Sequence, residues 1–202
     1  EILPLLDELH LVSKALYQRR YHKGYIPFNM PEIEFVYSED GKVVDLKQVV
    51  ETESHKIVEN CMLIANEYVA TRLNTLSDSG MYRVHELPEE EAIERIVQLL
   101  KFYRVEPKGK NLKGQKYIQS LLEAMPNSDY HRVFDPFLLR SMKKARYDTL
   151  PIGHFGLATK YYTHFTSPIR RICDLTVHHL LKQYFWSHET QKRLAENELK
   201  KI

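Results

Sequence analysis

Apolar residues recur along this chain with two different periods, and each period predicts one kind of element. In the first twenty positions they fall three or four residues apart, which is the spacing of one helix face, so a helix is predicted over residues 3–21. Residues 32–37 and 42–50 instead alternate apolar and polar positions on either side of a Ser-Glu-Asp-Gly turn. This alternation predicts a β-hairpin in which Gly41 adopts a positive φ.

A second long helix is predicted over residues 53–74, with Thr52 as its N-cap. Its apolar positions spread over a wide arc, and a helix with so wide an arc is expected to be buried on more than one side. These positions are Ile57, Val58, Cys61, Met62, Ile64, Ala65, Tyr68 and Val69.

The rest of the chain alternates helical patterns with extended ones. Extended segments are predicted at 82–88 and 147–157, a flexible basic loop at 107–114, and helices at 89–103, 117–125, 136–146 (capped by Asp135), 168–186 and from about 189 onward. The chain has no internal repeat, and its one plausible linker is the short basic loop at 107–114, so we expect one domain over residues 1–202. Its predicted class is a predominantly helical α+β fold with a β-hairpin and several packed helices.

Composition narrows the functional classes only slightly. The 202 residues are 43% hydrophobic and 28% charged, which is ordinary for a globular protein, and no apolar run approaches the length of a bilayer span. A net charge of +2 is too small to indicate nucleic-acid binding, so such affinity must come from local clusters. Cys61 and Cys173 lie in apolar patterns without zinc-ligand spacing, and we expect free thiols in a cytoplasmic protein.

The best candidate for a functional site lies at residues 153–171, read GHFGLATKYYTHFTSPIRR. Ser167 followed by Pro168 is a helix-start pattern, which places Arg170 and Arg171 beside the free N–H groups of a first helical turn. Two guanidinium groups at a helix N-terminus form a phosphate site, and the preceding aromatic rings can stack on bases. The alternative is an ordinary buried helix start whose arginines pair with nearby acids.

This segment, with the Asp-Leu and Val-His pairs that follow it, resembles a run typical of the RNB family of 3′→5′ exoribonucleases, the ribonuclease II and ribonuclease R group. Three more stretches resemble the family in the same order, at residues 19–32, 35–66 and 82–88. The chain departs from the family pattern at four positions, namely Tyr25, Ile172, Cys173 and His179.

The resemblance implies a processive hydrolase that releases nucleoside 5′-monophosphates from the 3′ end of single-stranded RNA, with Mg²⁺ in the complete enzyme. The family holds this metal with an aspartate run of the form D-x₅-D-x-DD, and these 202 residues contain no such run. We therefore expect the chain to be the C-terminal part of an RNB catalytic domain that binds no metal alone and is inactive alone. Its expected partners are RNA, the rest of the RNB domain and flanking cold-shock and S1 domains, without a membrane.

The resemblance also implies roles for individual residues. Arg170 matches the catalytic arginine, which would stabilise the charge that develops on the scissile phosphate. Arg171 would contact a backbone phosphate or be a structural partner of Asp174. Phe28 matches a base-clamping ring, with a core phenylalanine beside a proline-rich turn as the alternative.

The family's ribose-sensing carboxylate accepts a hydrogen bond from a 2′-hydroxyl and falls at Glu59 or Asn60. The spacing from Phe28 favours Asn60, where an amide replaces the carboxylate and accepts more weakly. The preference for RNA over DNA therefore stays open. A structural hydrogen bond between Glu59 and Asn66 is an alternative, because the two residues lie seven apart on one helix line.

Tyr162, His164 and Phe165 precede the two arginines and would line the RNA channel, with at least one of them in the core. The alternative to an enzyme is a non-catalytic RNA-binding or scaffold module of the same fold. A third class is an unrelated helical domain whose basic clusters are solvated surface. Salt-dependent RNA binding separates this third class from the other two.

Overall fold

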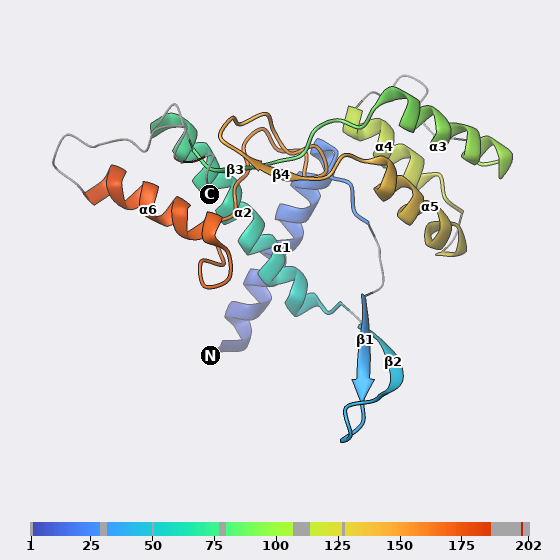
Figure 1. The fold of residues 1–202 in the computed structure, drawn as a ribbon, viewed down its shortest axis with the longest axis horizontal. Coiled ribbons are helices and arrows are strands. Elements are labelled where there is room, and N and C mark those ends of the chain that lie inside the picture. Colours follow the sequence, from blue (N-terminus) through green and yellow to red (C-terminus); the bar gives the residue numbers. More distant parts are fainter. Residues whose placement is uncertain are drawn as a thin grey trace.

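A computed structural model describes residues 2–28, 32–49, 51–76, 80–106, 114–126, 128–186 and 199 of the chain. Its elements, in order, are α1 (Ile2–Lys23), β1 (Glu32–Tyr37), β2 (Val43–Val49), α2 (Glu53–Leu76), β3 (Tyr82–Val84), α3 (Glu90–Phe102), α4 (Gly114–Glu123), α5 (Ser128–Ser141), β4 (Arg146–Asp148) and α6 (Ile172–Trp186) (Figure 1). The described part is predominantly helical with two small antiparallel sheets, which confirms the predicted class. None of its helices is both long and apolar enough to cross a membrane.

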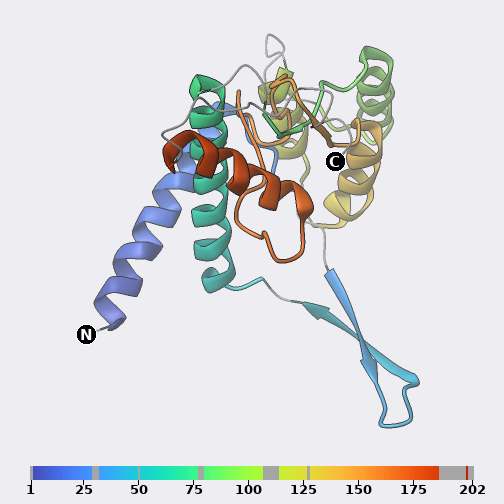
Figure 2. The same ribbon diagram turned by 60° about the vertical axis from the view of Figure 1, so that its left-hand side comes forward.

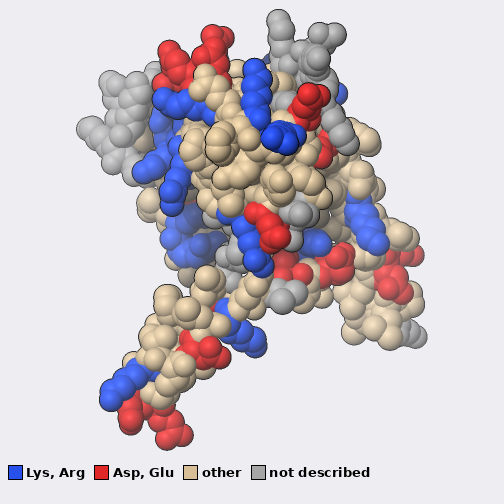
Figure 3. All heavy atoms as spheres, turned by 90° about the vertical axis from the view of Figure 1, so that its right-hand side faces the viewer, with Lys and Arg blue, Asp and Glu red and all other residues tan. Residues whose placement is uncertain are grey.

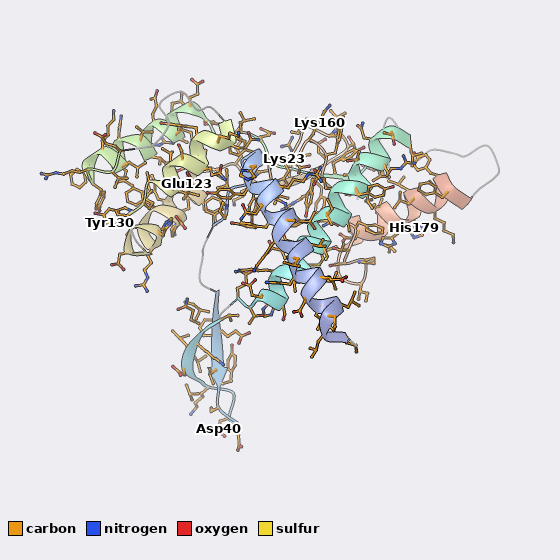
Figure 4. All side chains as sticks on the ribbon, turned by 180° about the vertical axis from the view of Figure 1, so that it is seen from behind. Lys23, Asp40, Glu123, Tyr130, Lys160 and His179 are labelled. Carbon is orange, nitrogen blue, oxygen red and sulfur yellow. The ribbon has the colours of Figure 1, made fainter. Side chains whose placement is uncertain are left out.

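The two long helices α1 and α2 pack against each other and form the centre of the molecule (Figures 1 and 4). Both agree closely with their predicted ranges, and the Thr52 carbonyl accepts the Lys56 backbone N–H at 3.2 Å at the start of α2. α2 is packed on more than one side, as expected, because it contacts α1, α6 and residues 82 and 84 of β3. The packed surface is not the predicted apolar arc, however. Tyr68 and Val58 are exposed, and the buried face consists of Asn60, Asn66, Val69, Ala70 and Leu73. Two amides replace apolar side chains on that face, so the apolar arc does not mark the packed side.

The hairpin of β1 and β2 projects away from the helices, with Asp40 at its tip (Figures 2 and 4). Its turn confirms the prediction, because Gly41 has a φ of 75°. The pairing of Phe35 with Leu46 places both on one face, and each is more than half exposed. The other face carries the pair Glu34 and Lys47. The hairpin therefore has one apolar face that no described residue covers, and uncharged surface lies between its charges in Figure 3.

Helices α3, α4 and α5 form a separate group around one core cluster at one end of the molecule (Figure 1). The predicted helix at 136–146 is wrong, because α5 runs from Ser128 to Ser141 and contains Pro136. Phe134 and Leu138, four residues apart, are both buried in this core. Packing on either side of Pro136 outweighs the preference of proline for a first helical position. Of the predicted basic loop at 107–114, residues 107–113 lie outside the described residues, and Gly114 begins α4.

A second core cluster joins α2 to α6 through Val69, Leu73, Cys173, Val177 and Leu180. The short sheet of β3 and β4 lies between the two cores and carries the segment that leads to α6 (Figure 1). Helix α6 begins at Ile172 and not at the predicted Pro168. The predicted terminal helix falls outside the described residues except for Leu199, which is buried in this second core.

Candidate nucleic-acid interface

A tight turn over residues 167–171 precedes α6 and carries both arginines of the predicted site. The Ser167 carbonyl accepts the backbone N–H groups of Arg170 at 3.3 Å and Arg171 at 3.2 Å. Asp174 holds this turn from the first turn of α6, since its carboxylate accepts the Ser167 backbone N–H at 2.8 Å. The arginines therefore lie in a turn that a hydrogen bond from Ser167 to Asp174 fixes to α6, and not within the helix as predicted.

The two arginines differ sharply in their surroundings. Arg171 forms a two-pronged ion pair with Asp174, with Nε 2.9 Å from Oδ1 and Nη2 2.9 Å from Oδ2, and the Asp174 side chain is fully buried. This contact is the structural alternative that the sequence left open for Arg171. Arg170 is exposed and takes part in none of the ion pairs that the described residues form. Its guanidinium is thus available to an anionic ligand.

The aromatic residues before the turn are held mainly by Asn66 of α2. The Asn66 side chain donates to the Tyr162 hydroxyl at 3.1 Å and accepts the Phe165 backbone N–H at 3.0 Å. Tyr162 is only 6% exposed, and the Phe165 ring stacks on the His178 ring with centroids 4.2 Å apart. Both rings therefore pack within the protein, and Asn66 bonds to this segment instead of to Glu59.

His164 belongs to a group of buried and half-buried rings that includes Tyr147, Tyr162 and His154. Its Nδ1 lies 2.8 Å from the Tyr147 hydroxyl. Burial, followed by the positive charges of Arg171, Arg83 and Arg170, lowers the pKa of His164 to about 4. Burial and the neighbouring His85 lower the pKa of His154 to about 3. Both imidazoles are therefore neutral at pH 7 and act there as hydrogen-bonding groups.

The other predicted contacts gather at a cleft of about 700 Å³ between α1, α2, α4 and α5. Phe28, Glu59 and Asn60 all line this cleft, together with Tyr17, Tyr21 and Tyr25. Phe28 also packs against the core of α3, α4 and α5. It is therefore in part a core phenylalanine, and its position at the cleft also fits a ring that stacks on a base. The cleft wall thus combines aromatic rings with the two candidates for a ribose contact.

Asn60 is almost fully engaged within the protein. Its Oδ1 accepts from Arg20 at 3.0 Å, and its Nδ2 donates to Ser13 Oγ at 3.0 Å and to the Lys56 carbonyl at 2.9 Å. Glu59 forms no hydrogen bond through its side chain with any described residue, and burial followed by the negative charge of Glu51 raises its pKa. The geometry therefore makes Glu59 the freer acceptor of the two at the cleft.

Charge differs between the cleft and the turn. Five carboxylate residues line the cleft against two lysines; these are Glu51, Glu53, Glu59, Glu123, Asp135, Lys14 and Lys56. Figure 3 shows that both signs of charge are likewise intermixed over the side of the molecule that carries α3, α4 and α5. The unpaired positive charge at the turn is therefore local, as the small net charge requires.

The described residues do not fit a catalytic metal centre. Nowhere in this part of the chain do three or more histidine, cysteine, aspartate or glutamate side chains gather closely enough to hold a metal ion. Asp174, the acid nearest to the arginines in sequence, is already bound to Arg171 and to Ser167. No step of the chemistry can thus be assigned to a metal on these residues.

Residues 3–187 match the RNB domain, so the chain belongs to the RNB domain family. It is 36% identical over 177 residues to ribonuclease R of Escherichia coli and 34% identical over 197 residues to ribonuclease R of Aquifex aeolicus. These alignments cover 88% and 96% of this chain but only 22% and 28% of the two relatives. The structure of Mycoplasma genitalium RNase R in complex with ribose-methylated single-stranded RNA matches with a TM-score of 0.88 at 29% identity, over 99% of this chain and 31% of that one.

Proposed function

We propose that this chain is the C-terminal part of the catalytic domain of a 3′→5′ exoribonuclease, and that Arg170 acts on the scissile phosphate. Membership in the RNB family and the similarity to proteins named ribonuclease R support the enzyme class. The observation that carries the residue assignment is the contrast at the turn. Asp174 neutralises Arg171, whereas Arg170 is exposed and has no acidic partner among the described residues.

The geometry explains what Arg170 would do. Asp174 binds the Ser167 backbone N–H and so fixes the turn to α6. The backbone that carries the Arg170 guanidinium is therefore already in place and needs little reorganisation when a phosphate binds. A guanidinium held in this way can donate two N–H groups to the non-bridging oxygens of a phosphodiester as negative charge develops there. Release of nucleoside 5′-monophosphates from single-stranded RNA is the reaction that this proposal assigns to the complete enzyme.

The cleft supplies a second part of the proposal. Phe28 would stack on a base near the 3′ end, and Glu59 would accept a hydrogen bond from a ribose hydroxyl. Asn60, whose amide is already bound on both sides, would hold Arg20 and α1 in place instead. Glu59 is therefore our choice for the family's ribose contact.

Metal chemistry belongs to other parts of the complete enzyme in this proposal. Mg²⁺ would activate water and stabilise the leaving oxygen. Because the sequence contains no aspartate run of the family's form, its aspartate ligands would come from another segment of the complete enzyme. The second candidate is a non-catalytic RNA-binding module of the same fold, and a cytoplasmic location is expected for either.

One experiment tests the assignment, with Arg170→Met and Arg170→Lys compared against Arg95→Met, which removes an exposed arginine from α3. In the complete enzyme we expect turnover on labelled single-stranded RNA to fall by about a hundredfold or more, while RNA affinity falls by less than about tenfold. Equal losses in both quantities would remove the transition-state role. RNA binding without any turnover in the wild type would favour the non-catalytic module.

A further inference from the structure

Arg83 is a second arginine near the turn that the proposed function does not use. It lies in β3 between Tyr82 and Val84, which are both about 1% exposed, and its backbone N–H donates to the Tyr162 carbonyl at 2.9 Å. Across the sheet it pairs with Tyr147 of β4. Its guanidinium carbon lies 4.9 Å from the centre of the Tyr147 ring, which is a cation–π contact. The side chain is half-buried and therefore well fixed.

Arg83 lacks a partner that Arg20 and Arg171, the other described arginines with buried or half-buried side chains, both have. Arg20 donates to Asn60 and Arg171 to Asp174. Even the exposed Arg146 donates to Glu86 and Asp148. No described residue accepts a side-chain hydrogen bond from Arg83 or forms an ion pair with it. The tyrosine ring covers one face of the guanidinium plane and leaves the N–H donors at its edge without a protein acceptor.

The groups around Arg83 connect it to the turn. The Tyr147 hydroxyl lies 2.8 Å from His164 Nδ1, so Arg83, Tyr147 and His164 form one contiguous row. The positive charges of Arg171, Arg83 and Arg170 all contribute to the lowered pKa of His164. Asp174 is the one carboxylate among the causes of that shift and already pairs with Arg171. Arg83 thus contacts the Tyr147–His164 pair directly, and the exposed Arg170 follows His164 in the same segment that leads to α6.

We infer that Arg83 binds a backbone phosphate of the RNA strand, next to the phosphate that Arg170 contacts. The ligand class follows from the chemistry, because two separate guanidinium groups without acids match the repeating single charges of a phosphodiester chain. Tyr147 holds the guanidinium plane, and the neutral His164 and the tyrosine hydroxyl add hydrogen-bonding capacity without further positive charge. This inference rests on the proposed function, since it places the same RNA strand at the turn.

The test measures binding of the 202-residue chain to a fluorescently labelled single-stranded RNA by anisotropy over a series of salt concentrations. Arg83→Met is compared with the wild type and with Arg95→Met, which removes the same charge from α3 at one end of the molecule, away from the central β3 (Figure 1). We expect Arg83→Met to weaken binding by about tenfold, which is the effect of one charge-assisted contact. We also expect the slope of log affinity against log salt to become shallower by about 0.7.

The outcomes separate this inference from the proposed function. If the wild-type chain does not bind RNA at low salt, the proposed function fails and this inference fails with it. If the wild type binds and Arg170→Met weakens binding, but Arg83→Met matches Arg95→Met in affinity and slope, only this inference is overturned.

Circular dichroism shows whether Arg83→Met keeps the fold. If Arg83→Met does not keep the fold, Arg83→Lys is used to test phosphate binding, because lysine keeps the positive charge and lacks the planar guanidinium. Phosphate binding then predicts a several-fold weaker affinity with the wild-type salt slope. An unchanged affinity in Arg83→Lys would overturn the inference.

Discussion

Asp174→Asn is the substitution whose effect follows most directly from the structure. The change keeps the volume of the side chain and one carbonyl oxygen, which can still accept the Ser167 backbone N–H. It removes the negative charge that faces Arg171 at two distances of 2.9 Å. The variant is thus left with a partly buried Arg171 guanidinium that has lost the negative charge that compensated it.

The magnitude follows from burial. Breaking a buried ion pair by removing one partner costs about 3–5 kcal/mol. Asp174 is fully buried, but 23% of the Arg171 side chain reaches solvent and can be hydrated, so the lower end applies and about 3 kcal/mol is expected. For a protein of this size each kcal/mol lowers the melting temperature by about 2–4 °C, which gives a fall of about 6–12 °C.

Thermal and urea unfolding followed by far-ultraviolet circular dichroism measure this effect. Asp7→Asn is the matched control, because Asp7 lies on the exposed part of α1 and forms no ion pair among the described residues. A double-mutant cycle with Arg171→Met isolates the pair, and we expect a coupling of about 1–3 kcal/mol. If Asp174→Asn has the same melting temperature as Asp7→Asn, or if the effects of Asp174→Asn and Arg171→Met are additive, the Asp174–Arg171 pair does not stabilise the fold.

Two further predictions concern the histidines and the hairpin. His164 and His154 have pKa values of about 4 and 3 in the fold against 6.5 in the unfolded chain. As the pH falls, the unfolded chain therefore takes up protons on these histidines before the folded chain does. Their contribution to the free energy of unfolding is fully present above pH 6.5 and falls toward pH 4, by at most about 1.4 kcal/mol per pH unit for each histidine. Urea midpoints at pH 7 and 5.5 should differ less in His164→Gln than in the wild type, and an equal difference contradicts the assignment. The apolar hairpin face should make the chain self-associate with rising concentration in sedimentation velocity, and Phe35→Ser with Leu46→Ser should abolish this, whereas Glu34→Ser should not.

Local patterns in the sequence predicted the long elements well. Periodicity alone located α1, α2 and the hairpin, because each contains enough repeats of its period to outweigh a few exceptions. The turn residue Gly41 was predictable for a steric reason, since a positive φ of 75° favours glycine. Short elements near proline were less predictable, because burial of Phe134 and Leu138 decides the start of α5 and depends on α3 and α4.

The candidate site was predictable in composition but not in its connections. Sequence pattern and resemblance pointed to Arg170 and Arg171 together and left a pairing of Arg171 with Asp174 open as one of two alternatives. The folded chain shows that this pair forms and that Arg170 has no such partner among the described residues. Asn66 illustrates the same limit, because its two hydrogen bonds reach Tyr162 and Phe165, which lie almost a hundred residues away. A contact over such a separation leaves no spacing in the sequence from which it can be read.

The turn before α6 also explains why two adjacent arginines can have different tasks. A pair of free guanidinium groups on neighbouring residues would repel each other and would have no fixed geometry. Asp174 removes this repulsion by binding Arg171 and, with its other contact, fixes the backbone at Ser167. The positive charge that remains belongs to Arg170 and is held next to α6 by a fully buried acid. The neutralised arginine is therefore as necessary to the proposed site as the exposed one, because it supplies the rigid support from which Arg170 meets a phosphate.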